Sequence, residues 1–197
     1  MAQPARKPVA SYADYLALEA TTREKHEFHQ GEIFAMAGGT PVHARLCTVV
    51  SALLDRSLGA RPCRAFNSEL RIYIPKINEA CCPDASVICG KLTHDPRDPQ
   101  GATNPVAIVE VLSRSTEVYD REAKFSAYRH LPTLRDYILV SQDHNQVEHF
   151  SRNDDGTWTF RPLVPGDTVR LTGAPATIAL DELYADIAEL RDDALLA

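Results

Sequence analysis

The sequence predicts an α+β or α/β fold in which a mixed central sheet is flanked by helices and extended by β-hairpins. Three observations support this prediction. The predicted segments follow one another along the chain as helix, several strands, helix and strand. Two strand segments, 83–89 and 105–112, are apolar runs of the kind that lie buried on both faces of a sheet. The chain of 197 residues is also long enough for one well-buried core.

The composition is ordinary for a soluble globular protein, with 44% hydrophobic and 24% charged residues. No apolar run approaches the roughly 20 residues that a membrane-spanning helix needs. The first ten residues include basic ones but lack the apolar stretch of a secretory signal. We therefore expect a flexible tail over residues 1–10, a single domain over residues 11–197, a cytoplasmic location and no membrane partner.

The cysteines give no sign of a disulfide framework. There are five of them, an odd number, and none forms a CxxC motif: Cys47, Cys63, Cys81, Cys82 and Cys89. The adjacent pair in this set does not have the spacing of a zinc site. We expect buried free thiols in a reducing, cytosolic setting.

The N-terminal part of the chain predicts a short helix and a hairpin. Residues 12–19 form the helical segment. Residues 26–37, "HEFHQGEIFAMA", predict two strands that turn at Gln30 and Gly31.

A longer helix is predicted over residues 41–58 by its end signals. Thr40 can cap it, Pro41 suits the first helical position, and Gly59 follows its end. Apolar residues recur between them at helical spacing, namely Val42, Leu46, Val49, Val50, Leu53 and Leu54.

Strands dominate the rest of the chain. Residues 68–75 alternate, with apolar residues on one face and Glu69, Arg71 and Tyr73 on the other. The remaining predicted elements are strands at 83–89, 105–112 and 135–141, a helix at 115–131, β segments at 145–152, 157–164 and 167–173, and a closing helix at 180–190.

Three acids, Glu69, Asp84 and Glu110, fall on three consecutive predicted strands. If these strands are neighbours, the carboxylates converge at one end of the sheet, where they would suit a hard cation such as Mg²⁺. Glu110 is the most telling, because a buried carboxylate needs a partner or a metal. An ion pair with Arg71 or Arg114 would also satisfy it. Solvent exposure of Glu69 and a turn role for Asp84 would explain those two residues without a metal.

Lys124 lies 14 residues after Glu110, on the helix that follows the strand. A helix returning from the end of a strand can place an ammonium beside the same site, where it would orient or deprotonate a water or stabilise charge on a phosphate. The alternative is a surface ion pair with Asp120, which stands four residues earlier on the helix and would stabilise it by a few tenths of a kcal/mol, roughly.

These motifs resemble the Uma family of restriction-endonuclease-like proteins, within the PD-(D/E)XK nuclease superfamily. The resemblance is carried by "PD" at 83–84, "VEVLS" at 109–113, "STEVYDREAKFSAY" at 115–128 and "DYILVSQD" at 136–143. The segments "HEFHQGEIFAMAGGTPVHARL" and "NSELRIYIP" are also similar to the N-terminal half of that family. The resemblance implies a restriction-endonuclease-like fold and metal-dependent phosphodiester hydrolysis.

The resemblance also implies site residues. Asp84 matches the Asp of "PD" and Glu110 the acid of the (D/E)XK element. The lysine expected two residues later is absent, since Leu112 stands there, and the resemblance moves its role to Lys124. Polar residues at similar positions make up the secondary candidates, which are Glu27, Glu69, His43 and Asp120. For His43, an ordinary place in the first turn of its helix is an equally good explanation.

We therefore expect an endodeoxyribonuclease dependent on Mg²⁺ or Mn²⁺. Asp84 and Glu110, with Glu69, would hold the metal, Lys124 would act on the attacking water or the transition state, and Arg114 and Arg121 would contact phosphates. The net charge of −6 means that DNA must be held by a local patch or through the cation. The alternative is a catalytically inactive nuclease fold that binds nucleic acid or protein. The apolar surfaces leave room for a homodimer.

Overall fold

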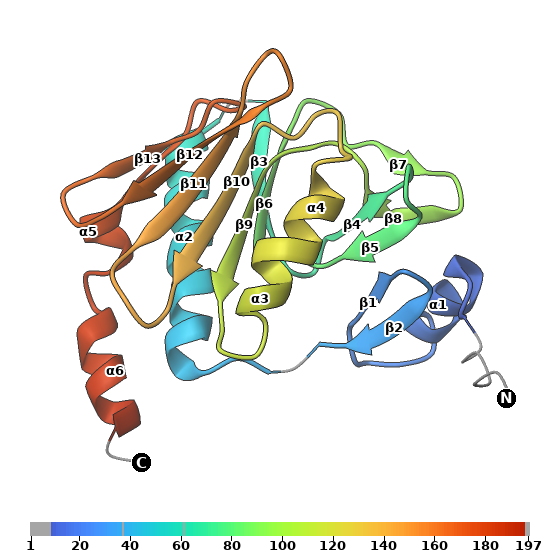
Figure 1. The fold of residues 1–197 in the computed structure, drawn as a ribbon, viewed down its shortest axis with the longest axis horizontal. Helices are drawn as coiled ribbons and strands as arrows, with labels where there is room; N and C mark the ends of the chain where they lie inside the picture. The colour runs from blue at the N-terminus through green and yellow to red at the C-terminus, as the bar shows by residue number, and fades with distance from the viewer. Residues whose placement is uncertain (1–8, 37, 61, 196–197) are drawn as a thin grey trace, which may run out of the picture.

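The structure, a computed structural model, describes residues 9–36, 38–60 and 62–195, with side chains as far as Arg191. It confirms a mixed α+β architecture of sheets flanked by helices (Figure 1). Of the expected N-terminal tail, residues 1–8 lie outside the described residues. Ala10 is attached to the domain, because its backbone N–H donates to the carbonyl of Gly31 at 2.8 Å.

The central sheet has six strands. Its order is β12 (Trp158–Leu163), β11 (Val147–Arg152), β10 (Asp136–Ser141), β9 (Pro105–Leu112), β6 (Ala85–Cys89) and β3 (Cys63–Asn67). β9 and β10 are parallel and the other neighbours are antiparallel. The sheet is therefore mixed, as the sequence predicts, and β9 lies in its middle.

A second six-stranded sheet lies beside it on the right of Figure 1. Its order is β2 (Glu32–Ala35), β1 (His26–His29), β5 (Glu79–Cys81), β4 (Arg71–Ile74), β8 (Asp98–Ala102) and β7 (His94–Asp95). The predicted hairpin is confirmed as β1–β2. Its turn residues Gln30 and Gly31 have φ of 49° and 79°, as a two-residue turn of type I′ requires.

The strand expected over 68–75 is shorter, and the face expected to be polar is buried. Only β4 is extended, while Glu69 lies in the turn before it. Tyr73 packs with Tyr12, Tyr15, Phe28 and Ala80. The alternation is real, but α1 covers the second face, so its polar groups must find partners inside the protein.

Helices flank the central sheet on both faces, whereas α1 (Tyr12–Glu19) lies beside the second sheet (Figure 1). The other helices are α2 (Pro41–Leu58), α3 (Glu117–Tyr119), the π-helix η1 (Asp120–Lys124), α4 (Phe125–Tyr128), α5 (Leu180–Leu183) and α6 (Ile187–Leu195). A short ribbon of β13 (Thr168–Arg170) and β14 (Thr177–Ala179) lies between β12 and α5 in the chain. The closing helix predicted over residues 180–190 is broken into α5 and α6.

The ends of α2 form as the sequence predicts. The side chain of Thr40 accepts the backbone N–H of His43 at 3.1 Å, Pro41 is the first helical residue, and Gly59 ends the helix with φ of 57°. These signals place His43 in the first turn of α2.

Alternation along β9 divides the core into two parts. Ala107, Val109 and Val111 pack in the cluster that contains the apolar face of α2. Ile108 and Leu112 pack in the cluster that contains α4. Because successive side chains of a strand point to opposite faces, Glu110 shares the face of the second pair and points toward the helix that carries Lys124.

The expectation of free thiols is wrong for two cysteines. Cys63 and Cys89 form a disulfide, while Cys47, Cys81 and Cys82 are free. The two bonded residues are direct partners in the antiparallel pairing of β3 with β6. Their separation of 26 residues hid this contact in the sequence. The argument from reduced thiols to a cytosolic setting does not hold for this pair.

A buried ion pair anchors the second sheet. The guanidinium of Arg71 donates to both carboxylate oxygens of Asp98 at 2.9 and 2.7 Å, and the Tyr12 hydroxyl donates to the same carboxylate at 2.6 Å. Glu19 lies 3.4 Å from Arg71. Arg71 is therefore committed to Asp98 and does not serve as the partner of Glu110.

Replacing Arg71 by methionine is expected to lower the free energy of unfolding by about 3–5 kcal/mol, because it leaves a buried carboxylate without its cation. Urea denaturation at neutral pH measures this. The matched control is Arg45→Met, since Arg45 pairs with Asp186 at the surface; its effect should stay under about 1 kcal/mol. Equal losses in the two variants would contradict a buried role for Arg71.

Within the described part of the chain, every helix is too short or too polar to cross a bilayer.

Candidate active site

The pairing of β6 with β9 brings Asp84 to Glu110. Ala85 is the partner of Val109 in this antiparallel ladder, so the residue before Ala85 stands across from Glu110. The backbone N–H of Asp84 lies 3.4 Å from Glu110 Oε2, and Asp84 Oδ2 accepts the N–H of Val111 at 2.7 Å. Asp84, which directly precedes β6, and Glu110 of β9 are thus neighbours in the sheet, each close to a backbone N–H of the other strand segment.

Lys124 lies among three acids, of which Glu110 is one. Its Nζ is 3.0 Å from Glu27 Oε1, 3.3 Å from Glu110 Oε1 and 3.2 Å from Asp120 Oδ1. Lys124 itself is buried, with 5% of its surface exposed. The surface pairing with Asp120 that the sequence left open is therefore excluded: the i,i+4 pair exists, but inside the protein.

Other groups fix the acids in place. The backbone N–H of Cys82 donates to Glu27 Oε1 at 2.9 Å, and the Tyr128 hydroxyl donates to Glu110 Oε1 at 3.0 Å. Glu27 comes from β1 of the second sheet, whereas Glu110 comes from β9 of the central sheet. The site therefore lies where the two sheets meet.

A π-helical turn over 120–124 carries two of these residues. Single π-turns within α-helices are rare and often occur at functional sites. Here both Asp120 and Lys124 are buried, and the Tyr137 hydroxyl donates to the carbonyl of Asp120 at 2.8 Å. The turn thus presents an acid and an ammonium together toward Glu110.

The cluster holds more carboxylates than cations. Glu27, Glu110 and Asp120 surround one ammonium, so one carboxylate at most is neutralised by it. Burial raises the pKa of Glu110 well above its usual range. Lys124 lowers this pKa, whereas the neighbouring acids raise it further. Burial alone would lower the pKa of Lys124, but the three acids raise it well above the ordinary value. Lys124 is therefore charged, and because one ammonium faces three carboxyl groups, an added cation would favour the ionised form of Glu110.

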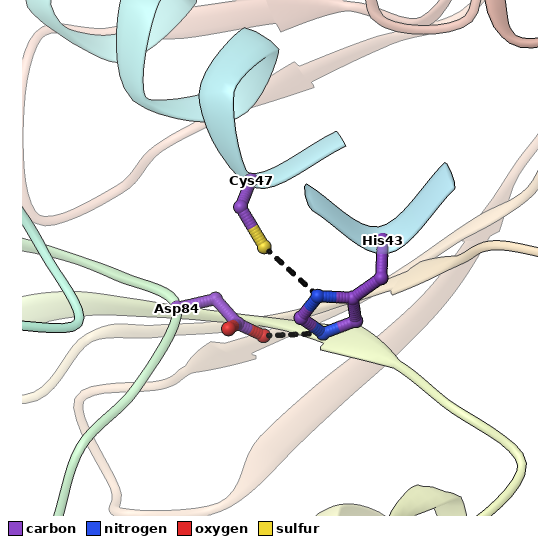
Figure 2. A group of neighbouring side chains, drawn as sticks. All are labelled: His43, Cys47 and Asp84. Carbon is purple, nitrogen blue, oxygen red and sulfur yellow. Dashed lines mark hydrogen bonds and ion pairs between the residues drawn. The ribbon is translucent and has the colours of Figure 1, made fainter. Parts of the chain in front are cut away.

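His43 forms an ion pair with Asp84. Its Nε2 lies 3.5 Å from Asp84 Oδ2, and its Nδ1 lies 3.5 Å from Cys47 Sγ (Figure 2). A Cβ on Gly39 would lie 2.6 Å from His43 Nδ1, so the absence of a side chain at Gly39 leaves space for the imidazole. The hydrogen bond to Asp84 raises the pKa of His43 despite its burial. Burial raises the pKa of Asp84, but His43 and the Val111 N–H lower it overall.

We expect Asp84→Asn to lower the pKa of His43 measured by NMR titration. The pair stabilises the fold fully below the ordinary histidine pKa of about 6.5 and loses that contribution as pH rises through the higher pKa of the folded state. The difference in unfolding free energy between wild type and Asp84→Asn should therefore shrink at alkaline pH. Asp186→Asn, which removes a surface acid, should leave the His43 titration unchanged. An unaltered His43 pKa in Asp84→Asn would contradict the ion pair.

A cavity of about 500 Å³ opens onto these residues. Its lining includes Glu27, Asp84, Glu110, Asp120 and Lys124. A second cavity of about 590 Å³ shares Met36, Gly38, Gly39, His43 and Asp84 with the first and adds Arg23 and Lys25. Asp84 and His43 thus stand at the junction of two openings.

The structure brings together Asp84, Glu110 and Lys124, together with the secondary candidates Glu27, His43 and Asp120. Glu69 does not join them: its side chain is 74% exposed and its carboxylate lies 2.6 Å from Lys25 Nζ. It stands in the turn before β4, beyond the extended segment, so strand alternation does not direct it to the sheet.

The two predicted phosphate contacts lie outside the acid cluster. Arg114 has 87% of its side chain exposed and lies 3.8 Å from Asp143. Arg121 is paired with both Glu117 and Glu148. Arg121 is therefore already neutralised by two acids of the protein.

Sequence reasoning missed Tyr119, Tyr128 and Cys47. Tyr128 stands four residues after Lys124, a spacing that places both on one side of the helix and could have indicated it. Cys47 stands four residues after His43 on α2 in the same way. The Tyr119 ring lies 5.6 Å from Lys124 Nζ, and among the described residues its buried hydroxyl has no hydrogen-bond partner.

Comparison with known proteins agrees with this fold. Residues 12–181 match the model of the Uma2 family, described as "Putative restriction endonuclease". The uncharacterized protein slr1290 of Synechocystis is 39% identical over 184 residues, 92% of this chain and 94% of that protein. A second Synechocystis protein, sll1609, is 35% identical over 156 residues, 79% of this chain and 88% of its own. A crystal structure from Anabaena variabilis, titled a putative nuclease belonging to DUF820, has a TM-score of 0.72 at 16% identity, covering 90% of this chain and 98% of that one. This chain belongs to the Uma2 family.

Proposed function

We propose that this protein is a metal-dependent endonuclease that hydrolyses phosphodiester bonds of DNA, with Asp84, Glu110 and Lys124 as its catalytic residues. The observation that carries the proposal is the surplus of carboxylates around one buried ammonium, beside an open cavity. The restriction-endonuclease description of the family and the nuclease title of the structural neighbour support the same reaction class.

The residues present fit a hard divalent cation, Mg²⁺ or Mn²⁺, since Asp84 and Glu110 offer carboxylate oxygens at the edge of the cavity. When bound, such a cation lowers the pKa of a water molecule and neutralises charge on the scissile phosphate. Glu69 is left out of this ligand set, because its carboxylate pairs with Lys25 at the surface.

Lys124 contributes a fixed positive charge. Because Glu27, Glu110 and Asp120 keep its pKa raised, it stays an ammonium at neutral pH and does not take a proton from water. Its role is to stabilise negative charge that builds on the phosphate during attack. The hydroxyl of Tyr128 holds Glu110 in place while this occurs.

DNA phosphates would follow the two joined cavities. Arg23 and Lys25 line the second of them, and Lys25 is already paired with Glu69. Arg23 would therefore supply the local positive charge that a chain of net charge −6 needs to hold a polyanion. Arg114 remains a proposed phosphate contact because it is exposed, whereas Arg121 is occupied by Glu117 and Glu148. A homodimer and a cytoplasmic location stay predictions.

The test combines cleavage with metal binding. Purified protein with Mg²⁺ or Mn²⁺ should nick plasmid or single-stranded DNA, and Asp84→Asn should weaken both cleavage and the binding of the cation measured by calorimetry. Asp186→Asn is the matched control, since Asp186 pairs with Arg45 at the surface. Both properties should remain intact in it.

Two outcomes would contradict the proposal. Unchanged divalent-cation binding in Asp84→Asn would show that the metal site is elsewhere. DNA binding without cleavage under any divalent cation would favour the alternative of a non-catalytic nucleic-acid-binding module.

A further inference from the structure

We propose that His43, Cys47 and Asp84 form a site for a borderline transition-metal ion such as Zn²⁺ or Co²⁺. A ring nitrogen, a sulfur and a carboxylate oxygen from these residues all lie within 4.8 Å of one another. This donor set differs from the all-oxygen set proposed for Mg²⁺, and it goes beyond the nuclease reaction. Nitrogen and sulfur ligands select zinc-like ions over magnesium.

Two elements bring the three ligands together. His43 and Cys47 are four residues apart on α2, so their side chains lie on one face of the helix. Asp84 approaches this face from the start of β6, as Figure 2 shows. The helix cap at Thr40 and the disulfide that joins β6 to β3 are part of the folded scaffold, so the site does not depend on a loose loop.

The spacing suits coordination with little movement. Zinc bonds of about 2.0–2.3 Å in a tetrahedral arrangement separate ligand atoms by roughly 3.4–3.6 Å. His43 Nδ1 is 3.5 Å from Cys47 Sγ, and His43 Nε2 is 3.5 Å from Asp84 Oδ2. The metal would take one of the two nitrogens, so one ligand pair already has the required separation. Since the three donor atoms lie within 4.8 Å of one another, the third ligand must move by about 1 Å to join it.

The surroundings support a metal in this place. The N–H of Val111 donates to Asp84 Oδ2 at 2.7 Å and so orients the carboxylate, as a supporting hydrogen bond does in known metal sites. All three residues line the cavity of about 590 Å³, which leaves room for a water molecule as a fourth ligand. On binding, the Cys47 thiol would lose its proton to solvent and coordinate as a thiolate.

Because Asp84 belongs to both donor sets, a metal held by His43 and Cys47 would take a ligand from the proposed Mg²⁺ site. Zn²⁺ should therefore inhibit Mg²⁺-dependent cleavage, if cleavage occurs, and Cys47→Ser should relieve that inhibition. The site itself requires no nuclease activity, so its test stands apart from that of the proposed function.

Titration of the intact protein with Co²⁺, followed by absorption spectroscopy, tests the site directly. We expect a thiolate-to-cobalt charge-transfer band in the near ultraviolet that saturates at one equivalent. Cys47→Ser should lose the band while its circular dichroism stays that of the wild type. His43→Gln should weaken the binding of Co²⁺ at this site.

Two controls separate the possible failures. Cys82→Ser removes another free thiol and should keep the band. Glu110→Gln should also keep it, although the same change should remove nuclease activity. A titration without any thiolate band, or a band that survives in Cys47→Ser, would overturn the site, whatever the nuclease assays show.

Discussion

Glu110→Gln is expected to abolish divalent-cation-dependent DNA cleavage, with a fall of about 100-fold or more in rate. Glutamine keeps the size of the side chain and can still accept the hydrogen bond from Tyr128, but it removes the charged oxygens that the proposed cation needs. Single-turnover cleavage of a labelled DNA fragment measures the effect.

The same substitution is expected to stabilise the fold at neutral pH. Burial raises the pKa of Glu110, so the folded protein disfavours its ionised form. The wild type therefore loses stability as pH rises above the ordinary glutamate pKa, and the glutamine variant avoids this loss. Urea denaturation across a pH series measures the difference.

Glu182→Gln is the matched control, because Glu182 pairs with Arg56 at the surface. Its cleavage rate should equal that of the wild type, and its stability should differ by less than about 0.5 kcal/mol. Cleavage that survives in Glu110→Gln would end the assignment of Glu110 as a catalytic residue. A loss of stability at neutral pH in that variant would contradict the surplus of negative charge.

Lys124→Met is expected to lower the free energy of unfolding by about 3–5 kcal/mol at neutral pH and to remove activity. Methionine fills a similar volume but leaves the three acids Glu27, Glu110 and Asp120 without their cation. Because its pKa is raised, Lys124 stays charged at neutral and acid pH and loses its proton only at more alkaline pH. The deficit should shrink in acid, because Glu110, whose pKa is raised, becomes protonated there and no longer needs a cation.

Urea denaturation at neutral pH and near pH 4, about the ordinary carboxyl pKa, measures this dependence. Lys91→Met is the control, since Lys91 is exposed and should change stability by less than about 0.5 kcal/mol. A deficit in Lys124→Met that is small, or that is the same at both pH values, would show that Lys124 does not hold the acids together.

Much of the central architecture follows from the sequence alone. The apolar run around Glu110 becomes β9 with the predicted bounds, and the end signals of the helix over 41–58 hold at both ends. Local signals of this kind depend only on neighbouring residues. The approach of Lys124 to Glu110 also followed, because a strand and the helix after it pack face to face.

Contacts between distant segments could not be predicted from the sequence. Glu27 reaches Lys124 across 97 positions, and no local pattern marks that meeting. The same is true of the disulfide between Cys63 and Cys89, which depends on the register of two strands. The prediction that Glu69 holds the metal was wrong for a different reason. The alternating pattern in the sequence begins before Arg71, where β4 starts, so Glu69 lies outside the strand.

The meeting of two sheets at Lys124 links the proposed catalytic site to complete assembly of the fold. An intermediate with only the central sheet formed would have Glu110 and the helix, but Glu27 enters with β1 of the other sheet. The full acid cluster therefore exists only once both halves have docked. If the proposed DNA cleavage is correct, half-folded chains would lack the full site and would not cut the DNA of the cell that makes them.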